Sequence, residues 1–139
     1  MTRTGPARPA DGPFASGRLN NARAYLEAAE AAVMRAESGA NANPIISHVV
    51  NSAIAYTDAL TAYYGGRVDQ KDHAAAVKAL RDVLGNRLPN AQQKRLNRIL
   101  RRKDEAQYGA RHAPLSRGLE LLNELKEFAG WAEAAIRES

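Results

Sequence analysis

The fold is decided by residues 43–66, which read NPIISHVVNSAIAYTDALTAYYGG. Asparagine followed by proline is typical of a helix start, because Asn43 can cap the first turn and Pro44 needs no hydrogen-bond acceptor there. Gly65 and Gly66 end the helix, since glycine tolerates the backbone of a helix terminus. One face carries apolar residues at helical spacing, which predicts that it faces a core. These residues are Ile46, Val49, Val50, Ala53, Tyr56, Leu60 and Tyr64.

The opposite face of this helix carries small residues where a surface helix normally has long charged side chains. Small side chains let a second backbone approach closely. We therefore predict a helix buried on both sides, at the centre of a bundle or in a dimer interface. An exposed alanine-rich face is the alternative. The face consists of His48, Ser52, Ala55, Ala59 and Ala62, flanked by Asn51 and Asp58.

Helices are predicted on both sides of this stretch, at about residues 18–37, 71–84, 91–107 and 116–137. Asn90, with Gln93 three residues later, has the spacing of a capping box for the third of these. Short links and the absence of strand patterns predict an all-α, antiparallel bundle of about five helices. Residues 1–16 are rich in glycine and proline, which predicts a disordered N-terminal tail before a single domain at 17–139.

The composition excludes several kinds of chemistry. The 139 residues include no cysteine, so disulfides, thiol nucleophiles and cysteine-ligated metals are absent. The three histidines are scattered, and no metal motif or cofactor site is predicted. The chain has no apolar run of about 18 residues and no signal-peptide pattern, so we expect a soluble, cytoplasmic protein without a membrane partner.

The positive charge is concentrated in residues 90–117. This range holds eight Lys or Arg and two acidic residues, an excess of six, whereas the whole chain has a net charge of +5. Like charges three and four residues apart repel on a helix and lower its stability. Bound phosphate would offset this loss of stability. A solvated helix face is the alternative. The candidate phosphate-binding residues are Lys94, Arg95, Arg98 and Arg111.

A second pattern lies at the end of this basic segment. Arg101, Glu105 and Tyr108 share one face if the helix continues to Tyr108, with Asp104 beside them. An arginine, a carboxylate and a phenol on one ridge can bind a phosphate and orient a hydroxyl group. The alternative is a surface ion pair between Arg101 and Glu105 beside a packed tyrosine.

A helical chain with arginines before Ala106-Gln107-Tyr108-Gly109, a short break at Ala113-Pro114 and a leucine-rich final helix resembles a HEPN domain. The resemblance covers about residues 19–136. The family signature is an arginine, four to six variable residues and a histidine, and a toxin subgroup adds a tyrosine two residues later. Arg101 or Arg102 takes the arginine position, Ala106 stands in place of the histidine, and Tyr108 matches the tyrosine.

The resemblance implies a small helical bundle that forms a homodimer, binds RNA or nucleotides, and belongs to a toxin–antitoxin or defence system. It implies that Arg101 or Arg102 binds phosphate and that Tyr108 positions or donates a proton, with Asp104 and Glu105 nearby. Because alanine replaces the usual proton-transfer group, an atypical or degenerate ribonuclease is expected. Asn51 and His112 are second-tier candidates, and His112 would approach the site if the chain turns at Gly109.

Two further hypotheses stay open. The chain could be a non-catalytic interaction module for a protein partner, such as a nucleotidyltransferase-like antitoxin, bound through Leu121, Phe128 or Trp131. It could also be a nucleic-acid-binding bundle without a catalytic role. Arg67 and His73 match the arginine-to-histidine spacing, but they straddle a loop, and we treat this match as chance.

Overall fold

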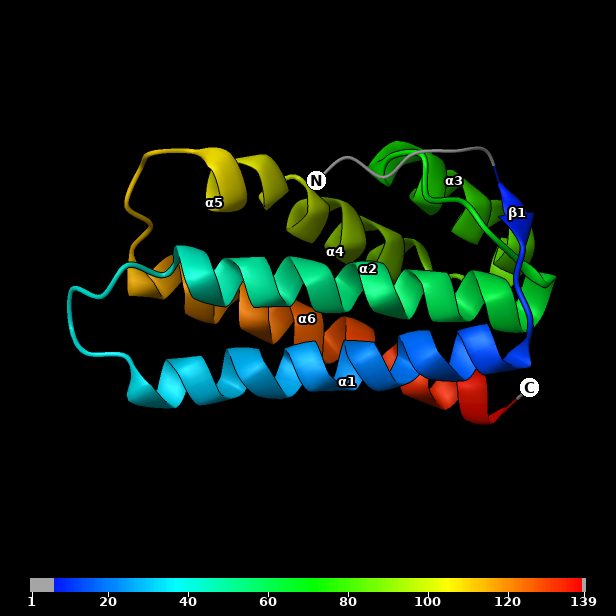
Figure 1. The fold of residues 1–139 in the computed structure, drawn as a ribbon, viewed down its shortest axis with the longest axis horizontal. Helices are drawn as coiled ribbons and strands as arrows, with labels where there is room; N and C mark the ends of the chain where they lie inside the picture. Colours follow the sequence, from blue (N-terminus) through cyan, green and yellow to red (C-terminus); the bar gives the residue numbers. More distant parts are fainter. Residues whose placement is uncertain (1–6, 139) are drawn as a thin grey trace.

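The computed structural model describes residues 7–138, and it confirms an all-α helical bundle (Figure 1). A two-stranded antiparallel sheet of two-residue strands is the other regular element of this range. No helix in residues 7–138 is long and apolar enough to cross a membrane. In chain order the elements are β1 (Arg8–Pro9), α1 (Gly12–Arg35), α2 (Asn43–Gly65), β2 (Arg67–Val68), α3 (His73–Leu84), the 3-10 turn η1 (Gly85–Arg87), α4 (Asn90–Leu100), α5 (Lys103–Tyr108) and α6 (Leu115–Arg137).

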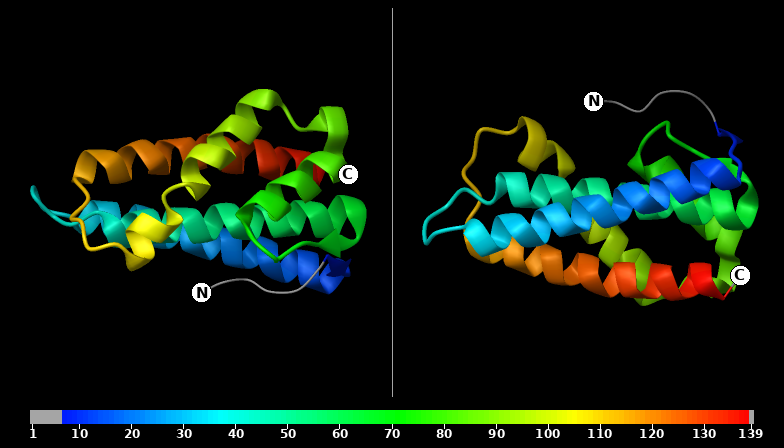
Figure 2. Two further views of the ribbon diagram at one scale, coloured as in Figure 1. Left: turned by 90° about the horizontal axis from the view of Figure 1, so that it is seen from above. Right: turned by 60° about the horizontal axis from the view of Figure 1, so that its bottom comes forward.

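Helix α2 is the central element and contacts α1, α3, α4, α5 and α6. In Figure 1 it runs between α1 and the α3–α5 segment, and Figure 2 shows α6 along its remaining side. The small face is buried as predicted: Ser52 is fully buried and donates to the Ala22 carbonyl of α1 over 2.8 Å. Gly66 ends α2 at a φ of +62°, a conformation that glycine adopts without strain. Helix α2 is therefore buried on both sides because it lies at the centre of the bundle.

The expected disordered tail is corrected for residues 8–16. Helix α1 begins at Gly12, six residues before the predicted start, because the Asp11 carboxylate accepts a hydrogen bond from Phe14 N over 2.9 Å. Arg8 and Pro9 pair with Val68 and Arg67 in the small sheet. Residues 1–6 of the predicted tail lie outside the described residues.

The link between α3 and α4 is held by Arg81, and the predicted capping box is wrong. Asn90 is the first residue of α4, and no side chain caps this helix. The side chains of Asn90 and Gln93 instead accept hydrogen bonds from the Arg81 guanidinium, at 3.0 and 2.8 Å. Arg81 also donates to the carbonyls of Gly85 and Leu88. One arginine thus joins the end of α3 to the start of α4.

The basic segment forms two helices where one was predicted. Helix α4 ends at Leu100, Arg101 and Arg102 form a turn, and α5 begins at Lys103. The apolar residues Leu96, Ile99 and Leu100 are buried and hold α4 in the core, whereas α5 packs against α2. The break gives α4 and α5 separate packing surfaces, and it overturns the prediction that Arg101 and Tyr108 lie on one continuous helix.

Candidate functional site

Arginines from two distant segments line one pocket between the α4–α5 turn and the start of α6. Arg98, Arg101 and Arg102 come from the first segment and Arg117 from the second. We call this the arginine pocket; its volume is about 210 Å³. Its complete lining is Arg98, Arg101, Arg102, Arg117, Glu120, Leu121 and Glu124.

A second pocket of about 410 Å³ adjoins the first, because Arg102 and Arg117 line both. We call it the loop pocket, since the 109–114 segment forms one of its walls. The two pockets together are the arginine groove. The loop pocket is lined by Asn43, Ile46, Arg102, Glu105, Ala106, Arg111, His112, Ala113, Pro114 and Arg117.

Carboxylates of α6 neutralise part of the charge in the arginine pocket. Glu124 Oε2 lies 3.0 Å from Arg98 Nη2 and 3.2 Å from Arg95 Nε, although the Arg95 contact lacks hydrogen-bond geometry. Glu120 lies 3.7 Å from Arg117. Arg95 and Arg98, both predicted as phosphate ligands, therefore also hold α4 against α6. Lys94 is exposed and lines neither pocket.

Arg101 and Arg102 carry the positive charge that α6 does not balance. Both side chains are exposed, and neither forms an ion pair with a residue in 7–138. Arg101 Nε approaches the Asn97 carbonyl at 3.4 Å, and this neutral acceptor leaves its charge uncompensated. Four arginines and two glutamates line the arginine pocket, which gives a formal charge of +2. An anion in this pocket would therefore find two guanidiniums without a carboxylate partner in residues 7–138.

The α4–α5 break separates the residues of the predicted ridge. Arg101 lines the arginine pocket, and Glu105 lines the loop pocket. Tyr108 is 61% exposed and lines neither of them, and the same holds for the exposed Asp104. The predicted arrangement of Arg101, Glu105 and Tyr108 on one face is therefore wrong.

Residues 109–114 form an extended link without a turn at Gly109, and this link nevertheless brings His112 to the loop pocket. His112 lines the same pocket as Ala106, which stands at the histidine position of the HEPN signature. Asn51, the other second-tier residue, accepts a hydrogen bond from Gln107 over 3.4 Å and so joins α2 to α5. Asn51 thus supports the position of the short helix.

Backbone contacts with the start of α2 hold the 109–114 segment in place. The Asn43 side chain donates to the Arg111 carbonyl over 2.6 Å, and Ala42 N donates to the Ala113 carbonyl over 2.9 Å. Ala113 N in turn donates to the Asn41 side chain. The wall of the loop pocket that carries Arg111 and His112 is therefore anchored at two of its positions.

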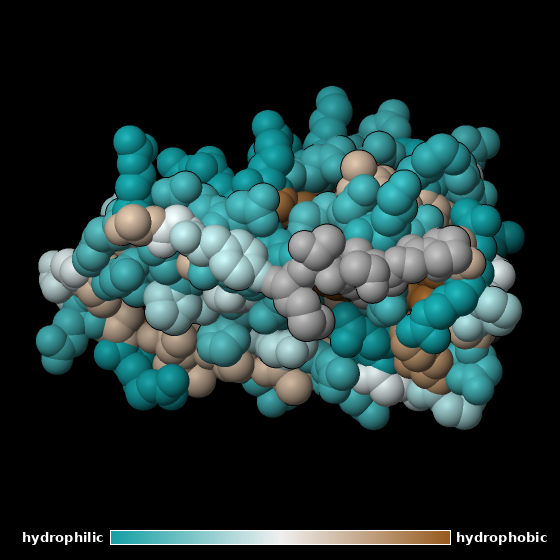
Figure 3. All heavy atoms as spheres, turned by 45° about the horizontal axis from the view of Figure 1, so that its top comes forward, coloured by the Kyte–Doolittle hydropathy of each residue, from teal (hydrophilic) through white to brown (hydrophobic). Residues whose placement is uncertain are grey.

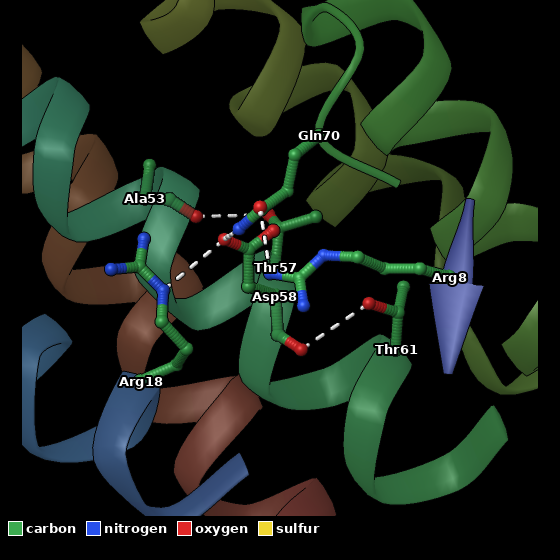
Figure 4. A network of polar contacts seen from close by, with 7 residues as sticks. All are labelled: Arg8, Arg18, Ala53, Thr57, Asp58, Thr61 and Gln70. Atoms are coloured by element: carbon green, nitrogen blue, oxygen red, sulfur yellow. Dashed lines mark hydrogen bonds and ion pairs between the residues drawn. The ribbon is translucent and has the colours of Figure 1, made fainter. Parts of the chain in front are cut away.

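A separate polar cluster surrounds Asp58 in the interior of α2 (Figure 4). Asp58 is 1% exposed, and its Oδ2 lies 3.2 Å from Arg18 Nε and 3.3 Å from Gln70 Nε2. Gln70 also accepts a hydrogen bond from Arg8. The cluster joins α1, β1 and the segment after β2 to the central helix. From the sequence, Asp58 was placed only beside the small face of residues 43–66, and these partners were not predicted.

A second polar cluster, in which only Tyr56 is buried, joins α1, α2 and α6. Arg23 donates two hydrogen bonds to Glu133, at 2.8 and 2.7 Å, and the Tyr56 hydroxyl donates a third at 3.0 Å. The Arg23 hydrogen bonds lower the pKa of Glu133 against the opposing effect of burial. Burial and the Glu133 carboxylate raise the pKa of Tyr56. These shifts indicate a structural contact between three helices, because Tyr56 is 1% exposed.

No group of three or more His, Asp or Glu side chains in residues 7–138 is arranged to hold a metal ion.

The face that carries α3, α4 and α5 is mostly hydrophilic (Figure 3). No protein-family model matches the chain, and no curated protein matches it either.

Proposed function

We propose that this protein is a HEPN-like, RNA- or nucleotide-binding protein whose arginine groove holds phosphate groups. One observation supports this most directly: Arg98, Arg101, Arg102 and Arg117 converge on one pocket from two segments of the chain. Guanidinium groups bind phosphate through paired hydrogen bonds and keep their charge at all physiological pH values. Four guanidinium groups and only two carboxylates line this pocket.

The groove suits a single strand. Its two pockets adjoin through Arg102 and Arg117, so successive phosphates of one strand can contact neighbouring guanidiniums. Binding of this kind depends on the phosphate backbone and falls steeply with salt. Exposed Arg101 and Arg102 would supply most of the affinity, because Arg98 and Arg117 each have a carboxylate within 4.0 Å.

A weakened ribonuclease is the second candidate function, and His112 supports it. His112 lines the same pocket as Ala106 and Arg102, so an imidazole and a phosphate-binding arginine share one site. An imidazole in this position can take a proton from a ribose hydroxyl group. Tyr108, the group that the resemblance implies for proton transfer, lies outside both pockets.

Of the three residues named for the protein-partner alternative, Leu121 and Phe128 are buried and Trp131 is half-buried. Leu121 is 5% exposed and Phe128 is fully buried, and Trp131 packs against Phe128 with ring centroids 5.6 Å apart. These side chains belong to the core or pack against it. A homodimer and an antitoxin-type partner stay predictions from the resemblance.

Binding and cleavage of a fluorescently labelled single-stranded RNA pool test both candidates. We expect Arg101→Ala/Arg102→Ala to weaken binding by about tenfold or more, since charged hydrogen bonds contribute about 1.5–3 kcal/mol each. The control, Arg35→Ala/Lys71→Ala, removes two exposed charges outside both pockets and should bind like the parent protein. Equal losses in the two double variants would reject a localised site.

The same assay separates binding from catalysis. Cleavage lost in His112→Ala and kept in Tyr108→Phe would establish an atypical ribonuclease that uses His112. Binding without cleavage by the parent protein would reject this second candidate and leave the binding function in place.

A further inference from the structure

The loop pocket has a chemistry that phosphate binding does not explain. Besides its arginines it has an apolar part, formed by Ile46, Ala106, Ala113 and Pro114. Ile46 is 2% exposed, while Ala106 and Ala113 are half-buried and pack against the hydrophobic core. A volume of about 410 Å³ lies within the usual range of small-molecule sites, about 300–1,000 Å³. The apolar part of the loop pocket suits a flat ring, and the arginine pocket beside it suits a phosphate attached to that ring.

Glu105 is the unusual member of this lining. Glu105 lines a pocket with three arginines, yet its side chain forms no ion pair or hydrogen bond with any residue in 7–138. A carboxylate opposes the binding of a bare phosphate, because like charges repel. It favours a ligand that presents N–H donors to it.

The absence of a side chain at Gly109 makes room for the Glu105 carboxylate. A Cβ atom at position 109 would be 3.0 Å from Glu105 Oε2 and 2.6 Å from the Glu105 carbonyl oxygen. Glycine thus lets the Glu105 side chain lie against the last turn of α5. The carboxylate therefore lies beside Gly109, where the segment that carries Arg111 and His112 begins.

We propose that the loop pocket binds a guanine base, with Glu105 accepting hydrogen bonds from its N1–H and N2–H groups. Guanine is the common base whose Watson–Crick edge presents two adjacent N–H donors to a carboxylate, whereas adenine and cytosine each present one amino group and uracil one imino group. Arginine is also the usual partner of guanine O6 and N7, and Arg111 lines the same pocket. The apolar part covers the face of the ring.

This inference rests on the proposed function, since the phosphate of the same nucleotide would occupy the arginine pocket. Arg102 and Arg117 line both pockets, so a base in one and its phosphate in the other fall within a single nucleotide or one step of a strand. The ligand is a guanine nucleotide, either free or within single-stranded RNA. The chemistry at Glu105 is the same for both sources.

Calorimetric titrations with GMP, AMP and inorganic phosphate test the base preference. We expect GMP to bind about tenfold tighter than AMP, the ratio typical of one bidentate contact to a base. Glu105→Gln should reduce the GMP-to-AMP ratio to about two or less, because the amide presents only one acceptor oxygen. The control Asp104→Asn removes the neighbouring carboxylate, which lines neither pocket, and should keep the ratio.

Short single-stranded RNAs that differ by one G-to-A replacement distinguish the two sources of guanine. Preference for guanine in the oligonucleotides and in GMP supports a site that reads a base within RNA, while preference with GMP alone supports a free nucleotide. Equal affinities for guanine and adenine, with RNA still bound, would overturn this inference and keep the proposed function. A parent protein that binds neither phosphate nor RNA would overturn both.

Discussion

Arg102 and Arg117 are fifteen positions apart in the chain, yet both line the arginine pocket and the loop pocket. Arg102 lies in the turn between α4 and α5, and Arg117 lies in the first turn of α6. Their positions relative to each other depend on α5, which packs on α2, and on the 109–114 segment, which is bonded to Ala42 and Asn43. The groove is therefore a product of tertiary structure.

Glu124 should limit RNA binding by neutralising the groove. We expect Glu124→Gln to tighten single-stranded RNA binding about twofold to fivefold, because Arg95 and Arg98 lose their shared carboxylate. The same change should lower the free energy of unfolding by about 1 kcal/mol or less, as is usual for partly exposed ion pairs. Fluorescence anisotropy and urea unfolding measure the two effects. Glu127→Gln, at an exposed position of α6, is the control, and equal tightening by both variants would contradict a local role for Glu124.

Arg81 should be a major contributor to stability. Its guanidinium donates to Gln93, Asn90 and the carbonyls of Gly85 and Leu88, and a lysine cannot reproduce this geometry. We expect Arg81→Lys to lower the free energy of unfolding by about 2 kcal/mol in urea denaturation. Lys78→Ala, at an exposed i,i+4 ion pair of α3, should cost about 0.5 kcal/mol or less. Similar losses in the two variants would show that the Arg81 contacts contribute little.

Two glycines of α6 should respond in opposite ways to alanine. A Cβ atom added at Gly130 would point into open space, with no atom of another element within 4 Å, so Gly130→Ala should stabilise the protein by about 0.5–1 kcal/mol through helix propensity. At Gly118 a Cβ would lie 3.0 Å from Ala42 Cβ and 3.4 Å from Ile45 Cγ2, where α6 approaches the start of α2. We expect Gly118→Ala to be less stable than Gly130→Ala by at least about 1 kcal/mol. Thermal unfolding of both variants tests this, and equal gains would mean that α6 can move away from α2.

The Arg23–Glu133 contact should make stability depend on acid pH. The folded state lowers the pKa of Glu133 below its ordinary value of 4.5, mainly through the Arg23 hydrogen bonds. Its contribution is therefore fully present above pH 4.5 and is lost as the pH falls through the lower pKa of the folded state. We expect Glu133→Gln to cost on the order of 1 kcal/mol at pH 7 and clearly less at pH 3. Urea unfolding at both pH values measures the difference, and a cost independent of pH would contradict it.

The fold class and the central position of α2 were predictable, because its apolar face and its small face are both local patterns of residues 43–66. The start of α1 was also within reach: Asp11 followed by Pro13 is a helix-start signal, but the surrounding glycines and prolines favoured a tail. The pairing of β1 with β2 joins residues 8–9 to 67–68, and such a distant contact has no local signal.

The break at Arg101–Arg102 could not be predicted from local sequence. Arginine and lysine are good helix formers, and neither proline nor glycine marks the turn, so propensity favoured one continuous helix. Packing decided the outcome, since α4 packs in the core and α5 packs on α2. For the same reason the candidates Arg98, Arg101, Arg102 and Arg111 lie in the groove, whereas Tyr108 does not. Arg117 belongs to the basic range 90–117, but only the tertiary structure brings it next to the other arginines of the groove.

The salt dependence of single-stranded RNA binding tests the central claim, that Arg101 and Arg102 hold phosphates in the arginine groove. Each phosphate contact on a single strand contributes about 0.7 to the slope of log K against log salt concentration. We predict that Arg101→Ala/Arg102→Ala reduces the magnitude of this slope by about 1.4 relative to the parent protein. The Arg35→Ala/Lys71→Ala control should keep the parent slope. A slope that is unchanged in the Arg101/Arg102 double variant would contradict phosphate binding at this site.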